Sequence, residues 1–269
     1  MVSFPNCKIN LGLNVIAKRS DGFHDIETCF YPIPWTDILE IIPSEEVKLD
    51  ITGLTIPGLE QENLCLKAYI LLKKDFDLPP VHIHLHKVLP TGAGLGGGSS
   101  DAVFALQTIN EMFHLSLSPV MLAGYAFALG SDCPFFIHRK AMIGKGRGEI
   151  LSPAKISLEK RFMVLVKPEI NVATAEAYAG IVPRKPSKSV QEIIEEIPCE
   201  FWKEYLVNDF EETVFRKFHG LAELKNNLYK AGAMYASMSG SGSSVFGIFN
   251  QTIDLKEQFA RMTVWSGEL

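Results

Sequence analysis

The stretch "LPTGAGLGGGSSDA", residues 89–102, says more about the fold of this chain than any other. A strand-like segment, "VHIHLHKV" (81–88), precedes it, and apolar side chains at helical spacing follow, at 102, 105, 106, 109, 112 and 113. A glycine-rich turn at the start of a helix presents backbone N–H groups and the positive end of the helix dipole, and both stabilise an anion. We therefore predict a phosphate-binding loop, with Ser99 or Ser100 as the helix cap.

Two familiar nucleotide-binding loops can be compared with this stretch. The P-loop pattern fails, because Gly98 is followed by Ser99 rather than by lysine. The dinucleotide pattern GxGxxG is matched formally at Gly92, Gly94 and Gly97, and Glu111 lies about twenty residues further on, as a ribose-binding acid would. However, the preceding strand alternates apolar residues with histidines, whereas a central parallel strand is apolar on both faces. The dinucleotide fold is therefore the less favoured alternative.

The three histidines of that strand, His82, His84 and His86, share one face. Alternate histidines on a strand can bind zinc, but no carboxylate or cysteine lies close to them in the sequence. A solvent-exposed strand face is the favoured interpretation, and a metal site is the alternative.

Composition narrows the class of protein. The chain has 269 residues, of which 47% are hydrophobic and 21% charged, so it is too apolar for a disordered protein. No apolar run reaches the roughly eighteen residues of a membrane span, and the N-terminus lacks the layout of a secretory signal, so we expect a cytoplasmic protein. The net charge of −5 and the dispersed basic residues argue against a nucleic-acid partner. Five scattered cysteines without a CxxC pair predict reduced thiols.

The order of the expected elements predicts an α+β fold, because strands and helices do not alternate strictly. The candidate domain boundary lies near "LSPAKISLEKR" (151–161), which gives domains 1–153 and 154–269. Strands are expected at 8–16, 37–42, 47–52, 81–88 and 161–167, a hairpin at 141–151, a strand–turn–strand unit at 233–249, and helices at 63–76, 118–130, 174–180, within 187–230 and at 252–262.

Polar residues at three further places are candidates for a site. Asp132, in "LGSDCPFF" (129–136), follows a helix end and is either a general base or a turn aspartate. Lys8 and Asn10 share a face of an otherwise apolar strand, where an isolated lysine usually extends outward to solvent. Phe23 and His24, in "DGFHDIE" (21–27), offer a stacking ring and a hydrogen-bonding imidazole, or form an exposed turn.

In this order, the segments resemble the superfamily of galactokinase, homoserine kinase, mevalonate kinase and phosphomevalonate kinase. Its three motifs are similar to the lysine-bearing first strand, the "GLGGGSS" loop and the late "SGSG" turn (239–242). Within it, "RSDGFHDIET", "LGSDCPFF" and "GKGRGEIL" resemble the 4-diphosphocytidyl-2-C-methyl-D-erythritol kinase family. Two positions differ: Cys7 stands where the family commonly has alanine, and Phe23 where it commonly has tyrosine. Phenylalanine keeps the stacking face and lacks only the hydroxyl.

The resemblance implies a ribosomal protein S5 domain 2-like N-terminal domain and a ferredoxin-like C-terminal domain, with the active site in the cleft between them. It implies an ATP-dependent kinase that uses Mg²⁺, whose protein ligands are not assigned. The partner would be a small-molecule substrate, cytidylyl-methylerythritol, with neither nucleic acid nor membrane involved, and the chain would be a monomer or a weak homodimer.

The resemblance also assigns residue roles. Asp132 would be the catalytic base and Lys8 its partner, and Asn10 would face the erythritol hydroxyls. Phe23 and Tyr178 would sandwich the cytosine, His24 would bind its edge, and Thr174 would line the same pocket. Asn63 and Lys87 would lie near the adenosine. The ATP phosphates would be wrapped by Pro90, Thr91, Gly92, Ala93, Gly94, Leu95, Gly96, Gly97, Gly98, Ser99 and Ser100.

Overall fold

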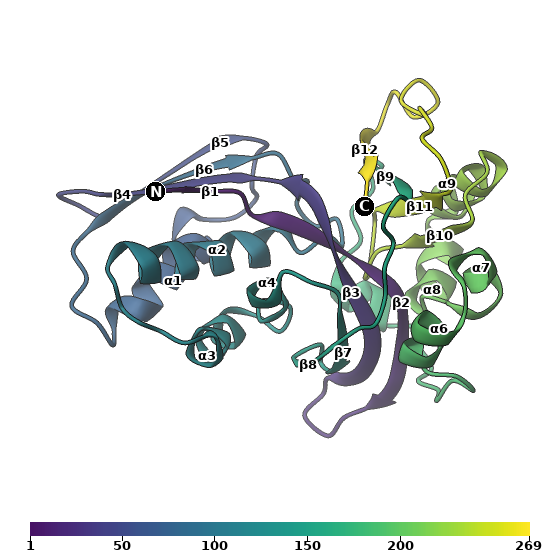
Figure 1. Cartoon of the computed structure of the whole chain (residues 1–269), viewed down its shortest axis with the longest axis horizontal. Coiled ribbons are helices and arrows are strands. Elements are labelled where there is room, and N and C mark those ends of the chain that lie inside the picture. Colours follow the sequence, from purple (N-terminus) through teal and green to yellow (C-terminus); the bar gives the residue numbers. More distant parts are fainter. The chain divides into compact units, whose positions relative to one another are not determined.

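The computed structural model describes all 269 residues, and the chain divides into two compact units (Figure 1). The first unit comprises Met1–Cys7, Trp35–Thr91 and Gly96–Arg139, and the second comprises Lys8–Pro34, Gly92–Leu95 and Lys140–Leu269. The middle of the glycine-rich loop therefore belongs to the second unit, although the strand before it and the helix after it belong to the first. Each unit is thus built from several separate segments of the chain. The predicted domains, 1–153 and 154–269, are instead single continuous segments, and their boundary stays a prediction.

The first unit is a four-stranded sheet with helices packed on one another beside it. The sheet order is β1 (Val2–Ser3), β4 (Ile38–Pro43), β6 (Val81–Lys87) and β5 (Lys48–Gly53). β4 is antiparallel to β1 and β6, whereas β5 runs parallel to β6. Helix α2 (Gly97–Met112) packs on β4 and β1, and α1 (Leu64–Lys73) and α3 (Pro119–Leu129) pack against α2. The short helices η1 (Glu60–Glu62) and α4 (Phe135–His138) complete this unit.

Strand β6 alternates between buried and half-buried side chains, as its sequence predicts. Val81, Ile83 and Leu85 are buried, whereas the three histidines between them are half-buried. The central strand of this sheet thus has one face in the core and one face partly open to water, as a mixed or antiparallel sheet allows.

The second unit contains two four-stranded sheets and the remaining helices (Figure 1). One sheet has the order β2 (Asn6–Lys18), β3 (His24–Thr36), β7 (Met142–Gly146) and β8 (Ile150–Pro153), and the other has the order β10 (Tyr235–Met238), β11 (Val245–Phe249), β9 (Phe162–Lys167) and β12 (Thr263–Glu268). The helices are α5 (Thr174–Tyr178), α6 (Val190–Glu196), η2 (Cys199–Phe201), α7 (Trp202–Tyr205), α8 (Phe210–Lys217) and α9 (His219–Lys230).

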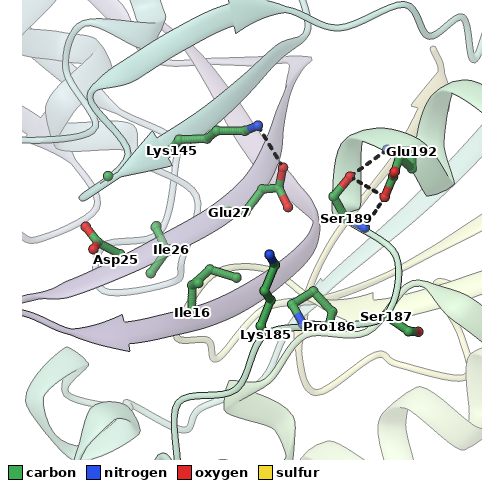
Figure 2. A pocket seen from close by; sticks show the side chains of 11 residues that line it. Ile16, Asp25, Ile26, Glu27, Lys145, Lys185, Pro186, Ser187, Ser189 and Glu192 are labelled. Atoms are coloured by element: carbon green, nitrogen blue, oxygen red, sulfur yellow. Dashed lines mark hydrogen bonds and ion pairs between the residues drawn. The ribbon is translucent and has the colours of Figure 1, made fainter.

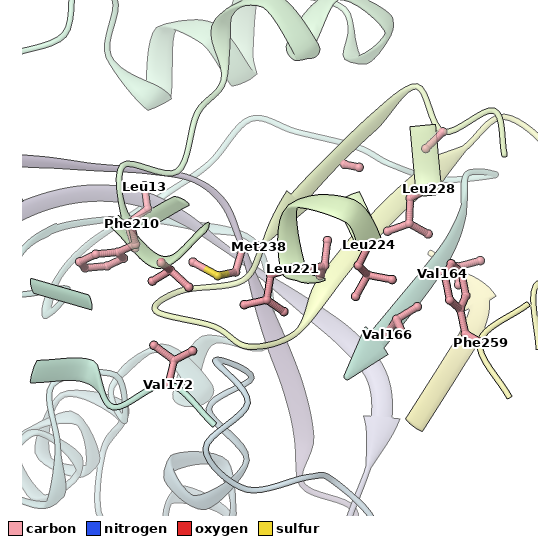
Figure 3. Close-up of a cluster of buried hydrophobic side chains, with 14 of the residues drawn as sticks. Leu13, Val164, Val166, Val172, Phe210, Leu221, Leu224, Leu228, Met238 and Phe259 are labelled. Carbon is pink, nitrogen blue, oxygen red and sulfur yellow. The ribbon is translucent and has the colours of Figure 1, made fainter. Parts of the chain in front are cut away.

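The core of the second unit lies between its strands and helix α9 (Figure 3). Leu221, Leu224 and Leu228 recur at helical spacing on one side of α9 and are almost completely buried. They face strand residues such as Val164 and Val166. A single leucine-to-alanine change in such a core typically costs about 2–5 kcal/mol, so this cluster holds the second unit together.

Two parts of the predicted element order are wrong. The helix predicted at 252–262 is absent, and turns occupy that segment before the unpredicted strand β12. Strand β3, which begins directly at His24, is also absent from the prediction, which has a turn opening at 21–27 and no element over the rest of this strand. The α+β class itself is confirmed, and all five cysteines are free thiols. No helix in the structure has both the length and the apolar character needed to cross a membrane.

Candidate active site

The glycine-rich loop turns through three left-handed glycines before its helix begins. Gly92, Gly94 and Gly96 have φ angles of 61°, 76° and 67°, a region that other residues rarely adopt. Helix α2 starts at Gly97 with Gly96 as its cap, and no side chain bonds to the cap position. The predicted serine cap is therefore wrong, because Ser99 and Ser100 already lie inside the helix. The first N–H groups of a sixteen-residue helix remain directed toward the loop, as an anion site requires.

The middle of the loop is fixed by a close backbone contact with the turn between β10 and β11. Ser239 Oγ donates to the Gly94 carbonyl at 2.8 Å, and the Ser244 N–H donates to the Ala93 carbonyl at 3.1 Å. A Cβ atom added to Gly94 would lie 2.0 Å from the Ser239 carbonyl oxygen, so only glycine fits there. The "SGSG" turn is thus the support of the loop as well as a hairpin connection.

Asn208 holds that turn from the other side. Its side-chain amide donates to the carbonyls of Met238 and Gly240, both at 2.8 Å, and its Oδ1 accepts the Phe210 N–H at 3.0 Å. Sequence reasoning missed Asn208, because it lies some thirty residues before the turn and belongs to no recognised motif.

Lys8 is buried, so the alternative of an isolated lysine that extends to solvent is wrong. Its Nζ donates to Asn10 Oδ1 at 2.7 Å and to the Gly94 carbonyl at 3.1 Å, and it lies 5.3 Å from the centre of the Phe30 ring. Asn10 in turn donates to Thr28 Oγ1 at 3.0 Å. This chain of hydrogen bonds places the ammonium group against the glycine-rich loop.

Phe23 and Tyr178, the two rings predicted to sandwich a base, each contact another side chain of the protein. Tyr178 stacks on His24 with ring centres 4.7 Å apart, and it also packs edge-on against Phe210. Phe23 is half-exposed, and the Arg147 guanidinium lies 3.7 Å from the centre of its ring. The sandwich of a base between Phe23 and Tyr178 stays a prediction, and Arg147 is a further residue beside it. Its place between two glycines of "GKGRGEIL" was the signal that sequence reasoning passed over.

Thr174 also contacts the supporting turn. Thr174 Oγ1 lies 3.3 Å from Ser241 Oγ. The structure therefore joins helix α5, which carries Tyr178, to the turn that supports Gly94.

Asp132 lies in the first unit, at the predicted position after the end of α3. It occupies the short turn between α3 and α4, where its carbonyl accepts the Phe135 N–H at 3.3 Å, and it is half-buried. Its role as a base stays a prediction.

A cavity of about 200 Å³ in the first unit lies beside the start of α2. Its lining includes Asn63, Lys87, Thr91 and Gly98, all of them predicted to lie near ATP, together with the apolar Ile51, Ile56 and Leu59. Asn63 also caps helix α1 by accepting the Cys65 N–H at 2.9 Å. An apolar wall beside a helix N-terminus is a feature expected of a nucleotide site.

Lys87 is the centre of a buried ionic cluster that sequence reasoning did not foresee. Its Nζ donates to Asp37 and, at 2.7 Å, to Asp101. Burial raises the pKa of the Asp101 carboxyl to about 7; the Lys87 ammonium opposes this rise and the Asp37 carboxylate adds to it. Burial lowers the pKa of Lys87, but Asp101 and Asp37 outweigh it and raise that pKa above its ordinary value.

A second cavity, of about 590 Å³, lies in the second unit beside β3 and β7 (Figure 2). In it, Lys145 Nζ and Glu27 Oε1 form an ion pair at 3.3 Å, and Ser189 and Glu192 form the capping box of α6. None of the predicted site residues lines this cavity.

The alternatives for the histidine strand have clear outcomes. His82 bonds to Asp50 at 2.8 Å, and His84 and His86 both lie within 3.0 Å of Thr52 Oγ1. No group of three histidine, cysteine or acidic side chains is placed to hold a metal ion.

The dinucleotide alternative also fails, because Glu111 lies in the helix that the loop itself begins and the sheet is mostly antiparallel.

Comparison with known proteins agrees with this geometry. Residues 63–140 match the family model described as the GHMP kinases N terminal domain, and residues 195–262 match the GHMP kinases C terminal model. Homoserine kinase from Cytophaga hutchinsonii shares the fold, with a TM-score of 0.68 at 16% identity over 98% of this chain and 95% of that one.

Closer relatives cover nearly the whole chain. A 4-diphosphocytidyl-2-C-methyl-D-erythritol kinase of Cytophaga hutchinsonii is 52% identical over 93% of both chains, and one of Parabacteroides distasonis is 46% identical over 100% of both. A crystal structure of 4-(cytidine 5'-diphospho)-2C-methyl-D-erythritol kinase superposes with a TM-score of 0.84 at 30% identity, over 99% of this chain and 98% of that one. The chain therefore belongs to the 4-diphosphocytidyl-2-C-methyl-D-erythritol kinase family.

Proposed function

We infer that this chain is an ATP-dependent kinase that phosphorylates the 2-hydroxyl of 4-diphosphocytidyl-2-C-methyl-D-erythritol, in the non-mevalonate route to isoprenoid precursors. The observation that carries this inference is the 52% identity, over 93% of both chains, to a relative of that name. The left-handed glycines, the start of α2 and the adjacent cavity support ATP as the phosphoryl donor.

Phosphoryl transfer depends mainly on positioning and on neutralising charge. The N–H groups at the start of α2 would bind the phosphates, and Lys8, held by Asn10 and the Gly94 carbonyl, would offset charge on the transferred group. Asp132 would accept the proton of the acceptor hydroxyl, a step typically worth about 10² to 10⁴ in rate. Phe23, Tyr178 and His24 would bind the cytosine of the acceptor, with Arg147 beside them.

Mg²⁺ accompanies ATP in such reactions and is usually bound through phosphates, waters and one or two carboxylates. No group of three suitable side chains converges in this structure. We assign no protein ligand to the ion, and none of the proposed steps depends on its position.

A coupled assay of ADP release tests the substrate. The purified chain, given ATP and Mg²⁺, should release ADP with the cytidylyl acceptor and not with homoserine or mevalonate. Turnover of homoserine or mevalonate with no response to the cytidylyl acceptor would assign the chain to a superfamily kinase of another specificity.

The other alternative is a nucleotide-binding protein without catalysis, in which Asp132 is only a turn residue. Asp132→Asn separates the two, because the amide keeps the shape of the side chain but cannot take up a proton. We expect kcat to fall by about 10²-fold or more, while ATP affinity stays near that of the wild type. Equal turnover by both proteins would remove Asp132 from the mechanism.

A further inference from the structure

The cluster of Lys87, Asp37 and Asp101 carries more negative than positive charge in a buried place. Lys87 is 2% exposed, Asp101 2% and Asp37 0%, so water screens none of the three groups. With both carboxyls ionised, one ammonium faces two carboxylates and a negative charge remains uncompensated. A buried charge without a partner is expensive, and the group usually becomes neutral instead.

Asp101 is the member of the cluster able to take up a proton. Asp37 has its oxygens occupied, because Oδ2 accepts from Lys87 and Oδ1 accepts the N–H groups of Val88 and Leu89 at 2.6 and 2.8 Å. Asp101 Oδ2 accepts from Lys87, but Oδ1 is buried and has no hydrogen-bond partner. A carboxylate held by several donors stays ionised, whereas one with an unsatisfied oxygen in an apolar place is the easier to protonate.

The elements packed around Asp101 add few other charges. Asp37 precedes β4, Lys87 ends β6, and Cys65 faces the cluster from α1, with a pKa that burial raises and that Asp101 raises further. Strand β1 carries no titratable side chain, Tyr125 of α3 bonds to Asp75, and α4 carries only His138. Glu60 and Glu62 of η1 lie at the exposed rim of the cavity.

The cluster adjoins the nucleotide site. Lys87 and Asp101 both line the 200 Å³ cavity with Gly98 and Thr91. A Cβ atom placed on Gly97, the first residue of α2, would lie 3.5 Å from Lys87 Nζ. The charge of the cluster therefore acts directly on whatever anion the start of α2 binds.

We propose that ATP binding is coupled to protonation of Asp101, so that the nucleotide binds most tightly when Asp101 is neutral and the cluster carries no net charge. A triphosphate beside the cluster is repelled by an ionised Asp101 and not by a protonated one. Binding therefore favours the protonated carboxyl, and by linkage a falling pH strengthens ATP binding. This coupling rests on the proposed kinase function, because it assumes ATP at the glycine-rich loop.

Burial already holds the pKa of Asp101 at about 7, so the coupling would operate near neutral pH. If ATP raises this pKa further by half a unit to one unit, affinity changes about threefold to tenfold across the titration. The direction follows from the sign of the charges: binding is tighter below the pKa of Asp101 and weaker above it.

Isothermal titration calorimetry of Mg-ATP without acceptor, at pH 6.0, 7.0 and 8.5, tests the proposal. The wild type should lose about threefold to tenfold more affinity than Asp101→Asn between the lowest and highest pH. The protonation of free ATP changes with pH in the same way in both titrations. The ratio of the two affinities therefore reports the contribution of Asp101. The exposed Asp77→Asn, in the same unit, is the matched control and should follow the wild type.

Titration in two buffers of different ionisation enthalpy should show extra proton uptake by the wild type near pH 7, relative to Asp101→Asn. If that variant does not fold, carbon NMR of the aspartate carboxyls in the wild type replaces it, and the Asp101 titration should move to higher pH with ATP. Parallel affinity profiles, or an Asp101 titration that ATP leaves unchanged, would overturn the coupling while the kinase function stood. Absence of ATP binding at every pH would overturn both.

Discussion

Two buried lysines, Lys8 in the second unit and Lys87 in the first, differ in the oxygens to which their ammonium groups donate. Lys8 is 3% exposed and Lys87 2%, so burial alone does not distinguish them. Lys87 donates to two carboxylates, whereas two of the hydrogen bonds of Lys8 run to the uncharged oxygens of Asn10 and Gly94. Lys87 is thus the centre of a buried ionic cluster, while these two bonds hold the Lys8 ammonium beside the glycine-rich loop. We infer that Lys87 mainly serves stability and Lys8 mainly serves chemistry.

The largest expected effect is that of Lys87→Met on folding. It leaves the buried Asp37 carboxylate without its ammonium, and breaking a buried pair in this way typically costs about 3–5 kcal/mol. The free energy of unfolding, measured by urea denaturation at pH 7.5, should fall by that order. Adding Asp37→Asn to this variant should recover part of the loss, because the unpaired buried charge is then removed and the amide oxygen can still accept the N–H groups of Val88 and Leu89. A Lys87→Met protein as stable as the wild type would contradict the comparison.

Lys8→Met should act on catalysis instead. Removing one charged donor from a phosphoryl-transfer site is expected to lower kcat by about 10² to 10³, because the transferred group loses charge stabilisation. Steady-state assays give kcat, and thermal unfolding of the same preparation gives stability. A fall in Tm as large as that of Lys87→Met, with kcat retained, would reverse the two assignments.

Asn10→Ala tests how far Lys8 depends on its orientation. The change removes one acceptor of the Lys8 ammonium and the link to Thr28, while the lysine itself and its bond to the Gly94 carbonyl remain. One hydrogen bond to a charged group contributes about 1.5–3 kcal/mol, so we expect kcat/KM to fall by about tenfold or more. Asn10→Asp is the matched variant: its carboxylate keeps the bond but adds a negative charge beside the ammonium. If Asn10→Ala matched the wild type in kcat/KM, the orienting role would be wrong.

Local patterns located the candidate residues but not their supports. The glycine-rich loop, Lys8, Asn10 and Asp132 all stand in short segments that could be singled out, although the roles proposed for Lys8, Asn10 and Asp132 come from the family resemblance. The Lys87 cluster joins residues at 37, 87 and 101, and Asn208 reaches Met238 and Gly240 across some thirty residues. Such contacts exist only after the chain has folded, so no window of sequence contains them.

The missed strand β3 and the wrongly predicted helix at 252–262 have local causes. Pro32 and Pro34 lie within β3, and prolines argue against a strand, but the ladder with β7 ends at Phe30, before either of them. In 252–262, Leu255 and Phe259 are both buried, so the helical spacing reported burial correctly. The Phe259 N–H bonds to the Leu255 carbonyl in a single turn, which does not continue as a helix. The helical spacing thus identified which side chains face the core, but it did not predict the conformation of the backbone.

Ser239→Ala should have the smallest effect, and it separates the orientation of the loop from the charge of Lys8. The Gly94 carbonyl accepts from both Ser239 Oγ and Lys8 Nζ, so removing the hydroxyl leaves Lys8 as its remaining side-chain donor. A neutral hydrogen bond contributes about 0.5–1.5 kcal/mol, and we expect KM for ATP to rise by about twofold to tenfold with kcat little changed. Lys8→Met should show the reverse, a fall in kcat at nearly constant KM for ATP. If Ser239→Ala lowered kcat as strongly as Lys8→Met, the position of the loop would control the chemistry, and the charge of Lys8 would lose its separate role.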